Sequence, residues 1–126
     1  MAIGISALLA TYAAAEPYQF SLVCDGQSGD EQGTTSPYHT EISIDLEAQL
    51  YCQDRCIAPV HIVKITPARI TFAQVERANG NLEVYVDRTT GAFRSLLYNI
   101  PEVPGYQQIF GTCKPEQFTP FPKTLF

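Results

Sequence analysis

Cysteines are the residues of this chain whose type and spacing most directly suggest chemistry, and there are four: Cys24, Cys52, Cys56 and Cys113. A zinc site needs cysteine or histidine ligands in short, paired spacings. Only Cys52 and Cys56 are close in sequence, and the two histidines, His39 and His61, lie far from both. We therefore expect no metal site, and instead two disulfides in a domain from an oxidising compartment.

The pairing of these cysteines has three alternatives on sequence grounds. A Cys24–Cys113 bridge would staple the first strand-like segment to the last. By the chain-entropy model its long loop contributes about 4–5 kcal/mol. Cys52 and Cys56 would then form a local bridge around residues 53–55, which shapes a turn more than it stabilises the fold.

The sequence contains few features that indicate catalytic residues. There is no G-x-S-x-G motif for a serine nucleophile, and the disulfides account for the cysteines. Carboxylate pairs such as Glu83 with Asp87 fall at turns or on a solvent-facing strand side, and Asp87 is expected to cap a turn. His61 is expected to be an outward polar residue. The sequence predicts a protein that is not an enzyme and uses no cofactor; a hydrolase would need convergent carboxylates or a histidine pair.

Binding residues are easier to propose. The segment Asp25–Pro37 is Gly-rich, acidic and without apolar residues, which predicts a mobile surface loop. Loops of this length often carry binding residues, although a tolerated insertion is the alternative. Tyrosines near turns, or outward on a strand, make good contacts unless they pack beneath the C-terminal tail. The candidate binding residues are Asp30, Glu31, Tyr38, Tyr85 and Tyr106.

Charge excludes two classes of partner. The 126-residue chain has a formal net charge of -5, and its eight basic residues are scattered. A nucleic-acid or membrane-surface binder needs clustered lysines and arginines. We expect a monomer that binds a protein or a small ligand, and neither nucleic acid nor a bilayer surface.

The N-terminus predicts export. Residues 3–15 carry no charge and end in Ala13-Ala14-Ala15 before Glu16-Pro17. This resembles a signal peptide or its remnant in residues 1–15, and the run is too short to span a bilayer. A short buried helix is the alternative. We therefore expect a periplasmic or secreted protein with one β-domain over residues 16–126, ending in an extended, proline-containing strap over residues 114–126.

Alternation of apolar and polar residues predicts the fold. Leu82–Val86 alternates with period two, and turn sequences lie before Leu82 and after Val86. About eight such short strands predict an all-β antiparallel meander closing as a small barrel, with a two-sheet sandwich as the alternative. We expect a three-residue turn with Gly80 left-handed, which would place Phe72 opposite Val86. Residues 99–105, with two prolines and a glycine, are expected to form a loop.

Short motifs along the chain resemble those of a group of small, uncharacterised exported proteins of Gram-negative bacteria. The motifs are Phe20–Cys24, Ile44–Leu46, Tyr51-Cys52, Val86–Gly91, Gly111–Cys113 and Phe118–Lys123. The resemblance implies export and a compact disulfide-bonded β-domain, but no activity.

In size and strand plan the chain is also similar to periplasmic lysozyme inhibitors, which are small β-barrels. Those proteins plug the lysozyme cleft with a Ser-Gly-x-x-Tyr loop. Here Ser28-Gly29 is followed by Asp30-Glu31, without the tyrosine. The sequence thus favours an exported binding domain. The alternatives are a lysozyme-inhibitor-like protein, a carrier whose interior holds a small apolar ligand in a cavity of roughly 300 Å³, and a hydrolase.

Overall fold

A single antiparallel sheet forms the protein in the computed structural model, which describes residues 18–77, 80–100 and 103–123. The all-β prediction is confirmed. The strands follow the order β4-β3-β2-β1-β9-β8-β7-β6-β5. In chain order they are β1 (Gln19–Asp30), β2 (Thr35–Asp45), β3 (Leu50–Gln53), β4 (Val60–His61), β5 (Lys64–Ile65), β6 (Arg69–Arg77), β7 (Gly80–Asp87), β8 (Ala92–Ile100) and β9 (Val103–Glu116).

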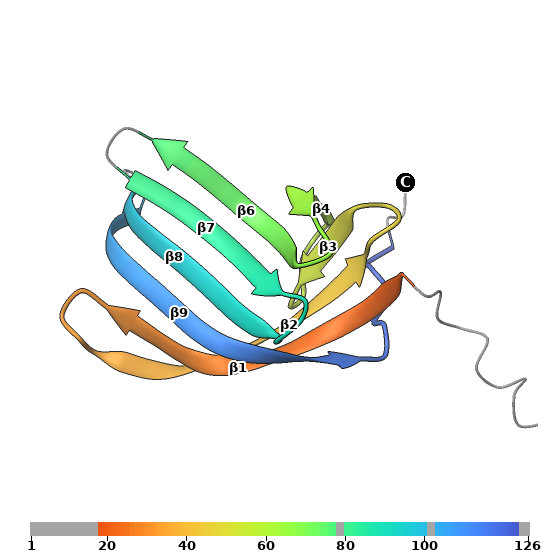
Figure 1. Cartoon of the computed structure of the whole chain (residues 1–126), viewed down its shortest axis with the longest axis horizontal. Helices are drawn as coiled ribbons and strands as arrows, with labels where there is room; N and C mark the ends of the chain where they lie inside the picture. The colour runs from red at the N-terminus through yellow and green to blue at the C-terminus, as the bar shows by residue number, and fades with distance from the viewer. Residues whose placement is uncertain (1–17, 78–79, 101–102, 124–126) are drawn as a thin grey trace, which may run out of the picture.

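The sheet curls into a half-barrel (Figure 1). β9 returns beside β1, so the first and last strands lie at its centre. The two outermost strands, β4 and β5, are consecutive in the chain and bridge the sheet edges at one end. Between them, Ile62 donates a backbone hydrogen bond to Gln49 on the β3 side, and Val63 donates one to Thr71 on β6. At this end the sheet edges are joined by a single segment of chain.

The core lies on the concave side of the sheet. Period-two alternation brings one face of each long strand inward, because successive side chains of a strand point to opposite sides. Its most deeply buried apolar side chains include Ile42, Ile44, Ile70 and Phe93, each no more than 1 % exposed. The alternation that predicted the meander therefore also selects the core residues.

Both predicted disulfides are confirmed. Cys24 and Cys113 are register partners on β1 and β9, with Cα atoms 4.0 Å apart and a sequence separation of 89. Cys52 at β3 joins Cys56, four residues later. The first bridge links the two strands at the centre of the sheet, and the second encloses Asp54.

The prediction of a mobile loop over Asp25–Pro37 is wrong. β1 continues to Asp30 and β2 begins at Thr35, so only residues 31–34 connect them. β1 also pairs with β9 as far as Asp30. This polar, glycine-containing segment has no apolar pattern of its own. It is extended because a strand pairs with its backbone on each side.

Two further expectations about connections are wrong. Residues 99–105 do not form one loop, since β8 reaches Ile100 and β9 starts at Val103. Phe72 does not pair with Val86; Ile70 does, because the ladder is irregular between Thr71 and Ala73. Gly80 begins β7 opposite Arg77, so two residues and not three separate the paired strands. The shorter connection alone would move the partner of Val86 from Phe72 to Thr71, and the bulge moves it one residue further, to Ile70.

The C-terminal strap begins later than expected, because Lys114 to Glu116 continue β9. Beyond it, Thr119 donates a backbone hydrogen bond of 3.0 Å to the hydroxyl of Ser21, which also contacts the Ser43 hydroxyl at 3.2 Å. The Phe118 and Phe121 rings pack edge to face. The expected signal segment, residues 1–15, and Phe126 lie outside the described residues. Within the described ranges, no helix is long and apolar enough to cross a bilayer.

Candidate functional site: the acidic hairpin and the end cavity

The turn between β1 and β2 is ordered by one carboxylate. The Asp30 side chain accepts hydrogen bonds from the backbone N–H groups of Gln32, at 3.0 Å, and Thr34, at 2.9 Å. The Asp30 backbone N–H donates to the Thr34 carbonyl, and Gly33, with φ of 81°, donates to the Asp30 carbonyl. A short aspartate and a left-handed glycine are the residue types that such a turn requires. The tip is therefore preorganised, while residues 31–37 remain exposed.

The β1–β2 hairpin, residues 19–45, concentrates the negative charge of the chain. It contains no lysine or arginine and five acidic residues: Asp25, Asp30, Glu31, Glu41 and Asp45. Removing these five from the 13 acidic residues leaves eight, which the eight lysines and arginines elsewhere balance. With its histidine neutral, the hairpin thus carries the whole formal net charge of -5.

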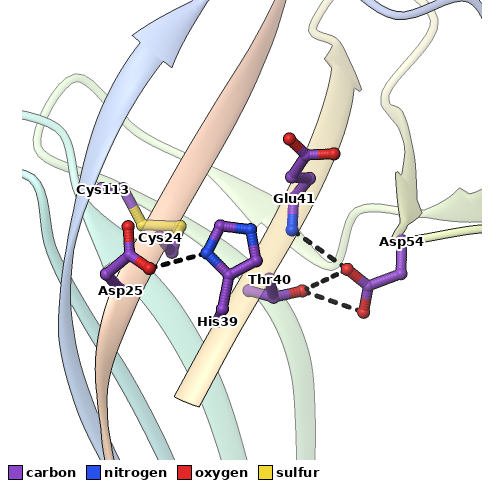
Figure 2. Close-up of polar contacts among 7 residues, drawn as sticks. All are labelled: Cys24, Asp25, His39, Thr40, Glu41, Asp54 and Cys113. Atoms are coloured by element: carbon purple, nitrogen blue, oxygen red, sulfur yellow. Dashed lines mark hydrogen bonds and ion pairs between the residues drawn. A yellow bond between two sulfur atoms is a disulfide. The ribbon is translucent and has the colours of Figure 1, made fainter. Parts of the chain in front are cut away.

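An aspartate–histidine pair spans the two strands of the hairpin (Figure 2). His39 Nδ1 lies 2.6 Å from Asp25 Oδ1, on register partners, and both side chains are well exposed. The hydrogen bond to Asp25 raises the pKa of His39 above its ordinary value; desolvation opposes this rise, and the nearby Asp25, Glu41 and Asp54 charges add to it. Protonated His39 can offset one of the hairpin's negative charges.

Asp54 fixes the position of β2 beyond the end of β3. Its carboxylate accepts hydrogen bonds from the Thr40 hydroxyl, at 3.0 and 3.1 Å, and from the Glu41 backbone N–H, at 3.0 Å. Figure 2 shows Asp54 reaching toward both residues from the segment after β3. The Cys52–Cys56 bridge constrains this segment, in which Asp54 has a φ of 54°. Sequence reasoning missed Asp54, although the short cysteine spacing around it was the available signal.

The two histidines do not form a catalytic pair. His61 lies opposite Leu50, which pairs with Asp45 at the end of β2, whereas His39 lies toward the other end of that strand. At about 3.3 Å per residue the two rows are about 20 Å apart. Both histidines are exposed. Among the described side chains, Asp25 is the only hydrogen-bond partner of the His39 ring. A hydrolase that relied on a histidine pair has no support in this arrangement.

The predicted binding tyrosines are separated. Tyr38 is half-buried, and its ring stacks on Phe93 while its hydroxyl accepts a hydrogen bond from Gln53. Tyr85 lies beneath the Arg69 guanidinium, 3.8 Å from the ring centroid. Tyr106 belongs to β9, but its side chain is not among those the structure describes. Only Asp30 and Glu31 lie together at an exposed tip.

A cavity opens at the end of the sheet opposite the tip of the β1–β2 hairpin. It has a volume of about 340 Å³, an apolar floor and a polar rim. The floor includes Phe20, Leu22, Ile70 and Val86, and the rim is the turn Asp87–Gly91. Sequence reasoning identified that turn but not its place beside a cavity.

The rim turn is held by Asp87. Hydrogen bonds from the Thr89 hydroxyl and from the backbone N–H groups of Thr89 and Thr90 lower the pKa of Asp87 to about 2. Asp87 is therefore ionised and serves as the expected turn cap. The Asp87 carboxylate and the Thr89 hydroxyl are thus occupied within the turn, and the Arg88 guanidinium at the rim donates to the Thr66 carbonyl at 2.8 Å.

Neither a metal site nor a comparison with known proteins assigns a further role to the described residues. In the part of the chain that the structure describes, no three His, Cys, Asp or Glu side chains gather into a group that could hold a metal ion. No protein-family model, curated protein or solved structure matches the chain.

Proposed function

We propose that this chain is an exported, non-enzymatic protein-binding domain that uses the β1–β2 hairpin to engage a basic recess on a partner. The observation that carries the proposal is the concentration of the whole net charge on one hairpin with an ordered, exposed tip. Charge complementarity guides association and specificity. A tip that is already ordered loses less conformational entropy on binding.

The proposal includes an exported location for the protein. Two disulfides are compatible with an oxidising environment. Together with the uncharged N-terminal run, they support a periplasmic or secreted protein. In that setting a monomer could bind a basic envelope protein.

The test compares a charge-neutral tip with a matched control. Asp30→Asn keeps a side-chain oxygen for the turn, so the double variant Asp30→Asn/Glu31→Gln removes charge while preserving the hairpin. Glu47→Gln/Glu116→Gln removes two exposed charges outside the hairpin. Each protein is immobilised and exposed to a Gram-negative envelope extract, and recovered proteins are quantified.

The wild type and the control should recover the same basic protein. The tip variant should recover about tenfold less, since two lost charge contacts at roughly 0.5–1 kcal/mol each give this order of change. Equal recovery by all three proteins would refute the hairpin as the binding surface. The lysozyme-inhibitor alternative has its own assay, lysis of bacterial cells by lysozyme, and unchanged lysis at excess protein would eliminate it.

The end cavity favours a second candidate function, binding of a small apolar ligand. Its volume of about 340 Å³ lies within the range of small-ligand sites. Decanoate, with an apolar chain for the floor and a carboxylate for Arg88, is a suitable probe. Saturable shifts of the Leu22 and Val86 methyl resonances are expected if the cavity binds it, and unchanged shifts would exclude this class of ligand.

A further inference from the structure

The outer edge of β6 is paired over only part of its length. β5 pairs with Ile70 and Thr71, and the Tyr51 ring packs against Phe72 with centroids 4.9 Å apart. From Ala73 to Arg77, β6 pairs with β7 on one side, and no described strand lies on the other. This second half of the strand, Ala73–Arg77, is an open sheet edge.

The backbone groups on that edge point outward at alternate residues. Before the bulge, the carbonyl of Thr71 points away from β7, since it accepts from Val63 on the β5 side. After the bulge, the ladder ends at the pair Arg77 and Gly80, which two residues separate in the sequence. The last pair of such a hairpin is hydrogen-bonded, so Arg77, Val75 and Ala73 point toward β7. In an antiparallel ladder the intervening residues face the other way. Gln74 and Glu76 therefore each present an N–H donor and a C=O acceptor to the open edge.

The side chains around this edge alternate as well. Ala73 pairs with Val84, and Val75 pairs with Leu82. These four side chains lie on the concave face and are half-buried. On the outer face, Gln74 is paired with Glu83 and is followed by the exposed Glu76. A strand placed here would cover apolar surface with every second side chain and face carboxylates with the others.

The opposite edge of the half-barrel is protected, unlike this one. β3 pairs only with Ile42–Asp45 of β2, so β2 is also unpaired at its other end. There the edge groups of Glu41 are taken by Asp54, through the Glu41 N–H and carbonyl. Two steps of the alternation before Glu41, Pro37 occupies an edge position and has no N–H to offer. Proline and charged residues are the usual means of blocking edge pairing.

We propose that the Ala73–Arg77 edge of β6 binds an extended peptide segment of a partner protein by strand addition. The segment has apolar side chains toward the concave face and basic side chains toward Glu76 and Glu83. Backbone hydrogen bonds to Gln74 and Glu76 supply the register, as in other strand-addition complexes. This surface is distinct from the acidic tip, so the proposal stands independently of the hairpin's function.

The test uses the synthetic peptide acetyl-KVKVKVK-amide and the full chain. Amide hydrogen exchange and backbone NMR shifts report on Gln74 and Glu76. Both amides should exchange rapidly in the free protein and become protected with peptide. Gln74→Pro removes an outward N–H without touching the β7 ladder, and it should weaken peptide binding about tenfold, which corresponds to one lost hydrogen bond. Thr35→Pro, on the β2 edge, should leave the affinity unchanged.

Several results would overturn the proposal. One is the absence of protection at Gln74 and Glu76 when the peptide is saturating. Equal affinity of the wild type and Gln74→Pro, or equal binding of a peptide N-methylated on its hydrogen-bonding edge, would show that attraction between charges alone accounts for binding. Protection that rises with protein concentration in the absence of peptide would assign the edge to a second copy of the chain instead.

Discussion

Tyr38 of β2 and Phe93 of β8 stack with ring centroids 6.3 Å apart and an interplanar angle of 8°, although β1 and β9 lie between their strands. In a flat sheet three strand spacings would separate them by about 14 Å. Gly26 and Gly111 occupy the intervening positions of the same row. The absence of two side chains, together with the curl of the sheet, lets the rings meet over the backbone.

Gly26→Ala should strongly destabilise the fold. A Cβ atom at Gly26 would lie 1.9 Å from the Phe110 carbonyl oxygen and 2.5 Å from the Gly111 Cα, which are backbone atoms that cannot move aside independently. We expect a loss of about 3 kcal/mol or more in the free energy of unfolding, measured by urea denaturation. Gly29→Ala is the matched control, because its nearest neighbour would lie at 3.7 Å. Similar midpoints for the two variants would show that the close approach at Gly26 is not required.

The two disulfides should differ in their contribution to stability. Replacing both Cys24 and Cys113 by serine releases a constraint with a sequence separation of 89, which the loop-entropy model values at about 4–5 kcal/mol. Replacing Cys52 and Cys56 releases a separation of four, at about 2 kcal/mol on the same scale. Urea unfolding of both double variants checks the order, and a larger loss from the short bridge would contradict it.

The sequence predicts these bridges and the strands because both leave local signals. Cysteine positions follow the strand-like segments, and the alternating segment Leu82–Val86 lies within β7. The sequence contains no such local signal for the length of the β1–β2 hairpin. Asp25–Asp30 is polar and contains glycine, and it is extended because β2 and β9 pair with it on both sides. Likewise, no local feature of the sequence predicts the bulge between Thr71 and Ala73, which shifts the β6–β7 register.

The candidate site was predictable to a similar degree. Asp30 and Glu31 stand out as acidic residues beside turn formers, and the structure places them at the tip. The partnership of Asp25 with His39 depends on a cross-strand register that continues past Cys24 into the segment predicted to be a loop. The cavity beneath Asp87–Gly91 is formed by strands distant in sequence, so no motif could reveal it.

The Asp25–His39 pair should make stability depend on pH. Because the folded-state pKa of His39 is raised above 6.5, the pair contributes fully below that pH. The contribution is lost as the pH rises through the folded-state pKa. An NMR titration of the imidazole should show that Asp25→Asn returns the His39 pKa toward 6.5 and removes this part of the pH dependence. A His39 pKa that is insensitive to Asp25→Asn would mean that the hydrogen bond does not control it.

The most direct test of the account is photo-cross-linking at the hairpin tip. A benzoylphenylalanine residue replaces Gln32 at the tip or, as the control, the exposed Ala48 in the turn after β2. In a Gram-negative envelope extract, position 32 should yield one discrete adduct with a basic protein, and position 48 should not. Excess wild-type protein should abolish the adduct, as should Asp30→Asn/Glu31→Gln in the same chain. Adducts of equal yield from both positions, or an adduct at position 32 that survives neutralisation of the tip, would contradict the proposal that the acidic hairpin is the binding surface.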